Sequence, residues 1–346
     1  MRDANFARLE RDYGIVLPGA VGFIQRDTNG GLAMDAQPQL FTTNNSGIPN
    51  YLTTYVDPDV IRAVYAPNKA VQIVGEETRK GDWTKIAAAF PVVESAGAVG
   101  SYGDYSTNGS SSANVNFVQR ESYHYQTFCN WGDRELEMYA EASINYSNEV
   151  QMSAVLVLNK FQNLSYFFGI AGLQCYGLLN DPSLTAALTP VTKSAGGTGW
   201  ALATPNEILV DYQKMVAGLI AQSAGLIDND SELVLAGPPV TLSYLANANS
   251  FNVKARDLLL GATPKVRFET AVQYNANSNA GSSGINTLQL ICPALEGRRT
   301  AICAFTEKLR THRLIADTSS YKQKRSQGTW GTIIARPLAI AAMVGV

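Results

Sequence analysis

The fold is decided by residues 115–168, which read VNFVQRESYHYQTFCNWGDRELEMYAEASINYSNEVQMSAVLVLNKFQNLSYFF and contain two periodicities in direct succession. Aromatic and β-branched side chains are frequent up to Cys129, and this composition favours an extended strand. From Asp133 onward, apolar or small side chains recur at steps of three and four residues, which predicts an amphipathic helix. A single helix from Asp133 to Phe168 would be about 54 Å long at 1.5 Å per residue. The stretch therefore predicts a strand that leads into one unusually long helix.

The predicted strand has a partner just before it in the chain. Residues 83–93 form a second extended segment, and the intervening residues 96–114 are rich in glycine and serine. Together these segments predict a two-stranded hairpin over residues 82–128. An isolated ribbon of this kind is marginally stable in water, so a hairpin this long needs a neighbouring surface. Its large aromatic side chains are those of Trp83, Tyr102, Tyr105, Phe117, Tyr123 and Tyr125.

Residues 1–58 have weak periodicity and many residues that interrupt helices and strands, such as Gly30-Gly31 and Pro49. A segment of this length without a core of its own is unusual inside a compact domain. It is either disordered or packed on another surface, and its scattered apolar residues favour an extended arm that packs. The segment opens without the apolar stretch of a signal peptide, and none is expected.

The composition predicts a protein whose surface is covered by other proteins. Charged residues make up 16% of the 346 residues, against about 25% in an average soluble protein. Hydrophobic residues make up 46%, which excludes a disordered polymer. Interfaces are depleted in charged residues and enriched in aromatic ones, as this chain is. The longest apolar runs, such as 337–346, are about half the ~20 residues that a membrane helix needs, so no membrane contact is expected.

The sequence contains no recognisable catalytic, metal or cofactor motif. The only two histidines, His124 and His312, have no second ligand at metal spacing. Glu135, Glu137 and Glu141 suit the first turns of a helix, where the macrodipole favours anions. We therefore expect no catalytic residue, no cofactor and no metal, and no enzyme. The four cysteines are far apart in the sequence and are expected to be free thiols: Cys129, Cys175, Cys292 and Cys303.

Positive charge is concentrated near the end of the chain. Residues 298–336 hold nine lysines and arginines against two acidic residues, a net charge of +7 in a chain of net charge −2. A solvated pair of strands would explain the pattern, and so would a face turned toward a polyanion with sequence-independent phosphate contacts. Lys322, Lys324 and Arg325 are the best candidates for DNA contact, because no apolar alternation buries them. Ion pairs with a neighbouring subunit are the alternative for these three residues.

Downstream of the long helix, predicted helices and strands alternate. Thr204 followed by Glu207 is the signature of a helix N-terminus. Strand and helix patterns alternate over residues 232–275, and strands resume at 287–292 and 300–309. The mixture predicts an α+β fold.

Two short motifs sharpen the interpretation of this order of elements. The long helix is followed by Gly177-Leu178-Leu179-Asn180-Asp181-Pro182, and the chain near its end reads Arg336-Pro337-Leu338-Ala339-Ile340. The motifs, and the order of elements over nearly the whole chain, resemble the major capsid proteins of tailed bacteriophages, which have the Hong Kong 97 type fold. The resemblance implies an α+β fold with an N-terminal arm, an extended β-hairpin loop, a long spine helix, and peripheral and axial domains.

The resemblance also implies domain boundaries. They are an N-terminal arm at 1–58, part of the peripheral domain at 59–81, the extended hairpin loop at 82–128, the peripheral domain with the spine helix at 129–185, the axial domain at 186–297, peripheral-domain strands at 298–335, and a return to the axial domain at 336–346.

A member of this family would be a structural subunit that assembles with copies of itself, as hexamers and pentamers, into an icosahedral shell around double-stranded DNA. The hairpin aromatic residues would contact neighbouring subunits, and the basic residues would contact the packaged DNA non-specifically. Further partners implied by the resemblance are the portal and, in some members, decoration or scaffolding proteins. The shell would form in the cytoplasm of the bacterial host and become the virion capsid.

Three points stay open at this stage. Some members of the family crosslink their shells through a Lys–Asn isopeptide bond; Lys85 lies on the hairpin, but nothing around it in the sequence specifies such a bond. A protein-filled cellular nanocompartment has the same fold and would hold protein in place of nucleic acid. An enzyme with an unrecognised site is the alternative of a different class.

Overall fold

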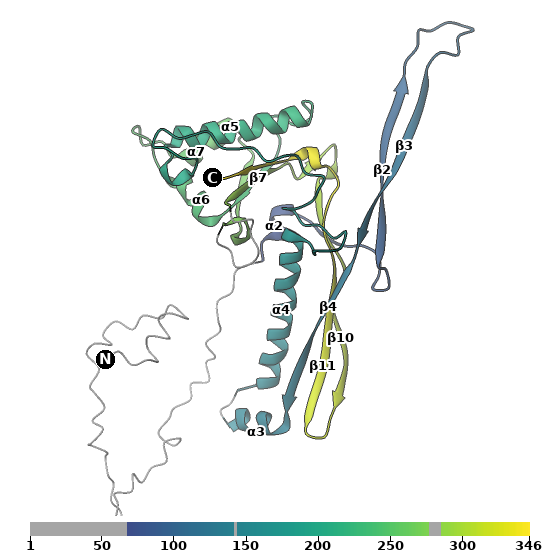
Figure 1. The fold of residues 1–346 in the computed structure, drawn as a ribbon, viewed down its shortest axis with the longest axis vertical. Coiled ribbons are helices and arrows are strands. Elements are labelled where there is room, and N and C mark those ends of the chain that lie inside the picture. Colours follow the sequence, from purple (N-terminus) through teal and green to yellow (C-terminus); the bar gives the residue numbers. More distant parts are fainter. Residues whose placement is uncertain (1–67, 142–143, 277–284) are drawn as a thin grey trace, which may run out of the picture. The chain divides into compact units, whose positions relative to one another are not determined.

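The computed structural model describes residues 68–141, 144–276 and 285–346 (Figure 1). Residues 66–136 and 146–346 belong to one compact unit, and the stretch 137–145 belongs to another and is described by itself. The expected N-terminal arm lies outside the described residues. The described part combines helices with two four-stranded sheets, so the expected α+β class is confirmed.

The first sheet is formed by β1 (Glu77–Arg79), β4 (Tyr123–Gly132), β10 (Ala301–Ala316) and β11 (Ser320–Ile334). Its order is β1-β10-β11-β4, with β1 parallel to β10 and the other neighbours antiparallel. Helix α4 (Tyr146–Phe168) lies along this sheet (Figure 1). Polar contacts join helix and sheet: Gln327 Nε2 donates to Asn159 Oδ1 at 3.2 Å, and the Ser165 and Thr329 hydroxyls are 3.0 Å apart.

The second sheet is formed by β5 (Leu233–Gly237), β6 (Val266–Thr270), β7 (Thr287–Ile291) and β12 (Ile340–Val344). Its order is β12-β7-β5-β6, so the last strand of the chain pairs with β7 and lies at an edge. Helices α5 (Pro205–Gln222), α6 (Pro239–Ser243) and α7 (Ala255–Ala262) share its hydrophobic core. The predicted capping box at the start of α5 is confirmed, because Thr204 and Glu207 each accept from the other's backbone N–H.

The shorter elements connect these sheets. They are α2 (Ala70–Val74), the two-stranded β8 (Ala294–Leu295) and β9 (Arg298–Arg299), and 3₁₀ turns at Trp200–Leu202 (η2), Tyr244–Ala246 (η3), Val272–Tyr274 (η4) and Pro337–Ala339 (η5).

A hairpin is present as predicted, formed by β2 (Ala87–Ala98) and β3 (Ser110–Glu121). The prediction of one strand from Val115 to Cys129 is wrong, because the second arm of the hairpin ends at Glu121. The Ser122 hydroxyl donates to the carbonyl oxygen of Lys85 at 2.8 Å, which closes the base of the hairpin. The next residue begins β4, which pairs with β11. β3 and β4 therefore follow each other with a break of one residue, although they have similar compositions and belong to different sheets.

The prediction of a single helix from Asp133 to Phe168 is also wrong, because the chain forms α3 (Asp133–Glu141) and then α4. The N–H of Ile144 donates to the carbonyl oxygen of Tyr139 at 2.9 Å, a five-residue step in place of the four-residue step of an α-helix. The sequence at 142–145 is Ala-Ser-Ile-Asn, in which serine, isoleucine and asparagine have lower helix propensity than the leucine, glutamate and methionine of α3.

The turn after α4 connects this helix to the second sheet. A side chain at Gly177 would place its Cβ 2.3 Å from the carbonyl carbon of Phe167, so only glycine fits there. Asn180 closes the turn by accepting from the Gly177 N–H at 2.8 Å and donating to the Phe168 carbonyl at 2.5 Å. The carbonyl of Leu178 accepts from Gln289 Nε2 of β7 at 3.0 Å, which ties the turn to the second sheet.

The segment before α5 is fixed by a buried ion pair. Lys193 Nζ donates to Asp211 Oδ2, and both side chains are fully buried. The indole N–H of Trp200 donates to the same carboxylate oxygen at 2.9 Å, and Asp211 Oδ1 accepts from the N–H of Val191 at 2.9 Å. One carboxylate of α5 therefore holds three points of the preceding loop.

The substitution Asp211→Asn should destabilise the isolated subunit by about 3–5 kcal/mol, the usual cost of leaving one partner of a buried ion pair alone. Urea unfolding of the isolated subunit, followed by tryptophan fluorescence, measures the change. The control Glu232→Gln breaks the exposed pair of Glu232 with Arg267, 3.9 Å long, and should leave the unfolding midpoint nearly unchanged. Equal midpoints for Asp211→Asn and the wild type would contradict the prediction.

Candidate interaction surface

The hairpin β2–β3 is a long two-stranded ribbon (Figure 1). Many of its apolar side chains are exposed. At its tip, Val99, Tyr102 and Tyr105 are 94% exposed or more. Along its arms, Val93, Val115 and Phe117 are each exposed by at least 55%. Exposed apolar residues that are contiguous in this way mark sites of protein–protein contact.

The base of the same hairpin is anchored. Phe90 packs against the buried Trp330 of β11. Arg120 Nη2 donates to Asp181 Oδ2 at 2.7 Å, with both side chains at most 7% exposed, and its guanidinium lies 4.8 Å from the centre of the Tyr176 ring. A fixed base and an uncovered tip make the hairpin a projecting arm that can reach another molecule.

Tyr123 and Tyr125, which the sequence assigned to the hairpin, lie in β4 instead and contact Phe161 of α4, although Tyr123 is still 36% exposed. Their rings stack at 6.3 Å, and the Tyr125 ring is 4.5 Å from that of Phe161 in α4. The Tyr125 hydroxyl donates to Gln327 Oε1 at 2.8 Å, and burial raises the pKa of this hydroxyl. The prediction that these two tyrosines lie in the hairpin is therefore wrong, and within the subunit they connect β4 of the first sheet to α4.

Trp83 precedes β2 and lies between the two histidines of the chain. Its ring is 4.6 Å from that of His124 and 6.4 Å from that of His312, both in edge-to-face orientation, and the Arg310 guanidinium is 5.1 Å from it. Burial lowers the pKa of His124, and the nearby Glu307 opposes this shift. Trp83 is thus a half-buried anchor at the base of the hairpin.

The three basic candidates of β11 do not form one group. Lys322 and Lys324 point to the same face, where their ammonium nitrogens lie 4.7 Å and 6.0 Å from the ring centre of Phe128. Arg325 points to the opposite face, is 8% exposed, and donates to the carbonyl and side-chain oxygens of Gln151 in α4 at 3.2 Å and 3.0 Å. The expectation that nothing buries Arg325 is wrong, because neighbouring residues of a strand face opposite sides.

The rest of the basic segment divides in a similar way. Four of its cations pair with acidic residues: Arg299 with Glu76, Lys308 with Glu77, Arg310 with Glu307, and Arg336 with Glu296. Among the described residues, Arg298, Arg313, Lys322 and Lys324 have no acidic partner. Within residues 298–336, these four are therefore the better candidates for phosphate contacts by the isolated subunit.

In the described part of the chain, no cluster of three or more His, Cys, Asp or Glu residues is arranged to hold a metal ion. None of its helices has the length and apolar character needed to cross a membrane. All four cysteines are buried and free, which confirms the expectation from their spacing.

Two features escaped the sequence analysis. The ion pair of Arg120 with Asp181 joins residues 61 positions apart, and only the position of Asp181 within the Gly177–Pro182 motif hinted at a structural role. A pocket beside α6 and β6 includes Lys254 and Arg256, two cations outside the basic segment. No periodic pattern in the sequence links these cations to the apolar residues of the pocket.

Comparison with known proteins identifies the fold. The family model described as Pa193 gp26 major capsid protein matches residues 39–345. The chain is similar to the capsid of Myoviridae phage XM1, with TM-score 0.71 and 13% identity over 86% of this chain and 99% of that chain. It is also similar to the capsid of a native GTA particle (TM-score 0.58, 12% identity, 85% and 96% covered) and to Gordonia phage Cozz (0.53, 11%, 84% and 90%). No curated protein matches. The chain therefore belongs to the Pa193 gp26 major capsid protein family and is a structural shell subunit with the Hong Kong 97-like fold.

Proposed function

We propose that this capsid subunit assembles with its own copies, as hexamers and pentamers, into an icosahedral shell that encloses the double-stranded DNA of a tailed phage. The observation that carries the proposal is the hairpin β2–β3, whose base is fixed and whose tip is uncovered. A two-stranded ribbon is marginal alone, so its exposed apolar residues are stabilised when a second subunit covers them. The capsid family match supports the same assembly.

The family match also supports the other partners of the proposal. The shell forms in the cytoplasm of the bacterial host, joins a portal, and becomes the virion capsid. Electron microscopy of the purified protein tests assembly directly. Shells that contain nuclease-protected DNA in infected cells support the phage function, whereas shells filled with protein would favour a nanocompartment.

The DNA contact that we propose is restricted to Lys322 and Lys324. Both ammonium groups lie on one face of β11 and have no acidic partner in the described chain. A capsid wall must tolerate dense DNA without selecting a sequence, and scattered lysines satisfy this requirement because each phosphate contact is weak and screened by salt. Phe128 beneath them holds the two side chains by cation–π contact.

Shortening the hairpin should block assembly and leave the fold intact. Replacing residues 99–109 by Asn-Gly joins Ala98 to Ser110 through a two-residue turn and keeps the paired strands. The isolated subunit should retain its melting temperature, because the removed side chains at the tip are almost fully exposed. Sedimentation should show loss of shells, and shells in wild-type yield would refute the role of the tip. The control, Tyr102→Phe with Tyr105→Phe, keeps the apolar area and should assemble.

The variant Lys322→Gln/Lys324→Gln should form empty shells normally and retain less genome. Nuclease-protected DNA per particle is the measurement. The matched control is Arg325→Gln, which removes the hydrogen bonds to Gln151 and should lower subunit stability without a specific loss of DNA. If the two lysines instead form ion pairs between subunits, their replacement will stop shell assembly itself, and the difference from the wild type will narrow at high salt, which screens the wild-type pairs.

A further inference from the structure

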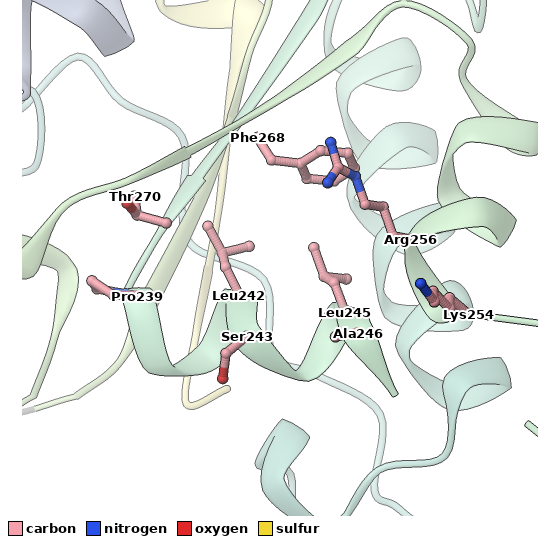
Figure 2. Close-up of a pocket in the computed structure, with 9 residues that line it drawn as sticks. All are labelled: Pro239, Leu242, Ser243, Leu245, Ala246, Lys254, Arg256, Phe268 and Thr270. Carbon is pink, nitrogen blue, oxygen red and sulfur yellow. The ribbon is translucent and has the colours of Figure 1, made fainter. Parts of the chain in front are cut away.

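A pocket of about 490 Å³ opens beside α6 and the edge strand β6 (Figure 2). Its apolar part is formed by Pro239, Leu242, Leu245 and Phe268, and its polar rim includes Lys254 and Arg256. Figure 2 shows the Arg256 guanidinium beside the ring of Phe268, to whose centre the distance is 5.3 Å. No acidic residue is among the described residues that line the pocket. An apolar floor with two cations at the rim fits an apolar group flanked by carboxylates.

Exposed apolar residues extend this surface beyond the pocket. Val240, Phe251, Val253 and Val272 are exposed by 59%, 85%, 36% and 36%, and each lies within three residues of a residue that lines the pocket. An apolar area with a polar rim of this kind marks a contact surface for protein. Lys254 and Arg256 form no ion pair in the described chain, and the nearby acidic residues Asp257 and Glu269 pair with neither.

The complementary surface lies at the other end of the same sheet. The loop from Leu226 to Glu232 precedes β5, and it carries an exposed Leu226 (56%) followed by the exposed acidic residues Asp228 and Asp230. The third acidic residue, Glu232, pairs with Arg267 of the same chain at 3.9 Å. Ile227 is buried and fixes the loop to the core, and the Asp228 carboxylate accepts from the Ser231 hydroxyl at 2.7 Å. These bonds lower the pKa of Asp228, so the loop presents charged carboxylates at neutral pH.

The two surfaces cannot meet within one subunit. The acidic loop adjoins Leu233 at the start of β5, whereas Pro239 of the pocket follows Gly237 at its end. The parallel neighbour β6 brings Thr270 of the pocket opposite Gly237, at that same end. The length of β5 separates the two ends by about 13 Å. The pocket and the acidic loop differ from each other and lie at opposite ends of β5. They can therefore meet only when the pocket of one copy faces the loop of the next, in head-to-tail order.

We propose that the pocket of one subunit receives the Leu226–Glu232 loop of the next copy, with Leu226 against Leu242, Leu245 and Phe268 and the carboxylates at Lys254 and Arg256. The contact is heterologous, and repeated contacts of this type close into a ring when the rotation permits. The proposal rests on the proposed shell function, since it assigns one of the contacts by which subunits form a capsomer.

The other acidic segment of the described chain is α3, which carries Asp133, Glu135, Glu137 and Glu141. A helix with its side chains is about 10–12 Å across, too wide to enter a pocket of this size. The loop combines an apolar side chain and carboxylates on a narrow turn, so the loop is the better occupant.

Reversal of charge on each side tests the contact. Lys254→Glu/Arg256→Glu and Asp228→Lys/Asp230→Lys should each raise the protein concentration needed for shell assembly by about tenfold or more, the effect of losing an interface hot spot. The variant that combines all four substitutions should recover assembly, because the attraction is restored with opposite sign. Arg313→Glu reverses an exposed cation of β10 as a control and should assemble like the wild type. Thermal melting of each isolated subunit checks that these exposed substitutions preserve the fold.

The outcomes separate this contact from the shell function. If the wild type forms shells and either reversed variant forms them equally well, the contact is wrong and the shell function stands. Failure of the combined variant to recover would also overturn the contact. Recovery of Lys254→Glu/Arg256→Glu by Glu135→Lys/Glu137→Lys in place of the loop substitutions would show that α3 is the occupant and refute the proposal. A wild type that forms no shells would refute the shell function itself.

Discussion

The buried ion pair between Arg120 of β3 and Asp181, 2.7 Å long, joins the parts of the subunit that have to stay in register. Asp181 belongs to the turn that follows α4, and the neighbouring residues of that turn bond to α4, to β11 and to β7. The turn that follows α4 therefore bonds to the hairpin base, to the long helix and to one strand of each four-stranded sheet. A buried charge without its partner costs several kcal/mol, so neither residue of the pair is replaceable alone.

This arrangement separates what a subunit needs in order to fold from what it needs in order to assemble. The residues that the fold requires are buried, such as Gly177, Trp200 and the pair of Lys193 with Asp211. The groups that we propose for assembly are ones that the folded subunit leaves exposed, at the hairpin tip and around the pocket beside β6. Low overall charge follows from this separation, because surfaces that copies of the chain cover gain little from charged side chains.

The sequence predicted the kinds of elements well and their ends poorly. Periodicity located α4, strand-forming composition located the second half of β3, and the capping residues located the start of α5, because these signals are local. The ends of the hairpin and of the long helix depended on local contacts: Ser122 closes the hairpin through a bond to Lys85, and the N–H of Ile144, beyond the end of α3, bonds to Tyr139 five residues earlier. The orientation of Arg325 was equally inaccessible, since a strand without apolar alternation gives no sign of which residues face a helix elsewhere in the chain.

The four buried cysteines determine how the folded subunit responds to an oxidising medium. Burial raises the pKa of Cys175 to about 11 and that of Cys303 to about 12, so these side chains are almost entirely protonated near neutral pH. The thiolate is the form that attacks disulfides and is oxidised, and thiol–disulfide exchange also requires access. A folded subunit with inaccessible thiols therefore forms no new covalent bonds when its surroundings change from reducing to oxidising. The covalent structure of the described chain is in this respect independent of the redox state of the medium.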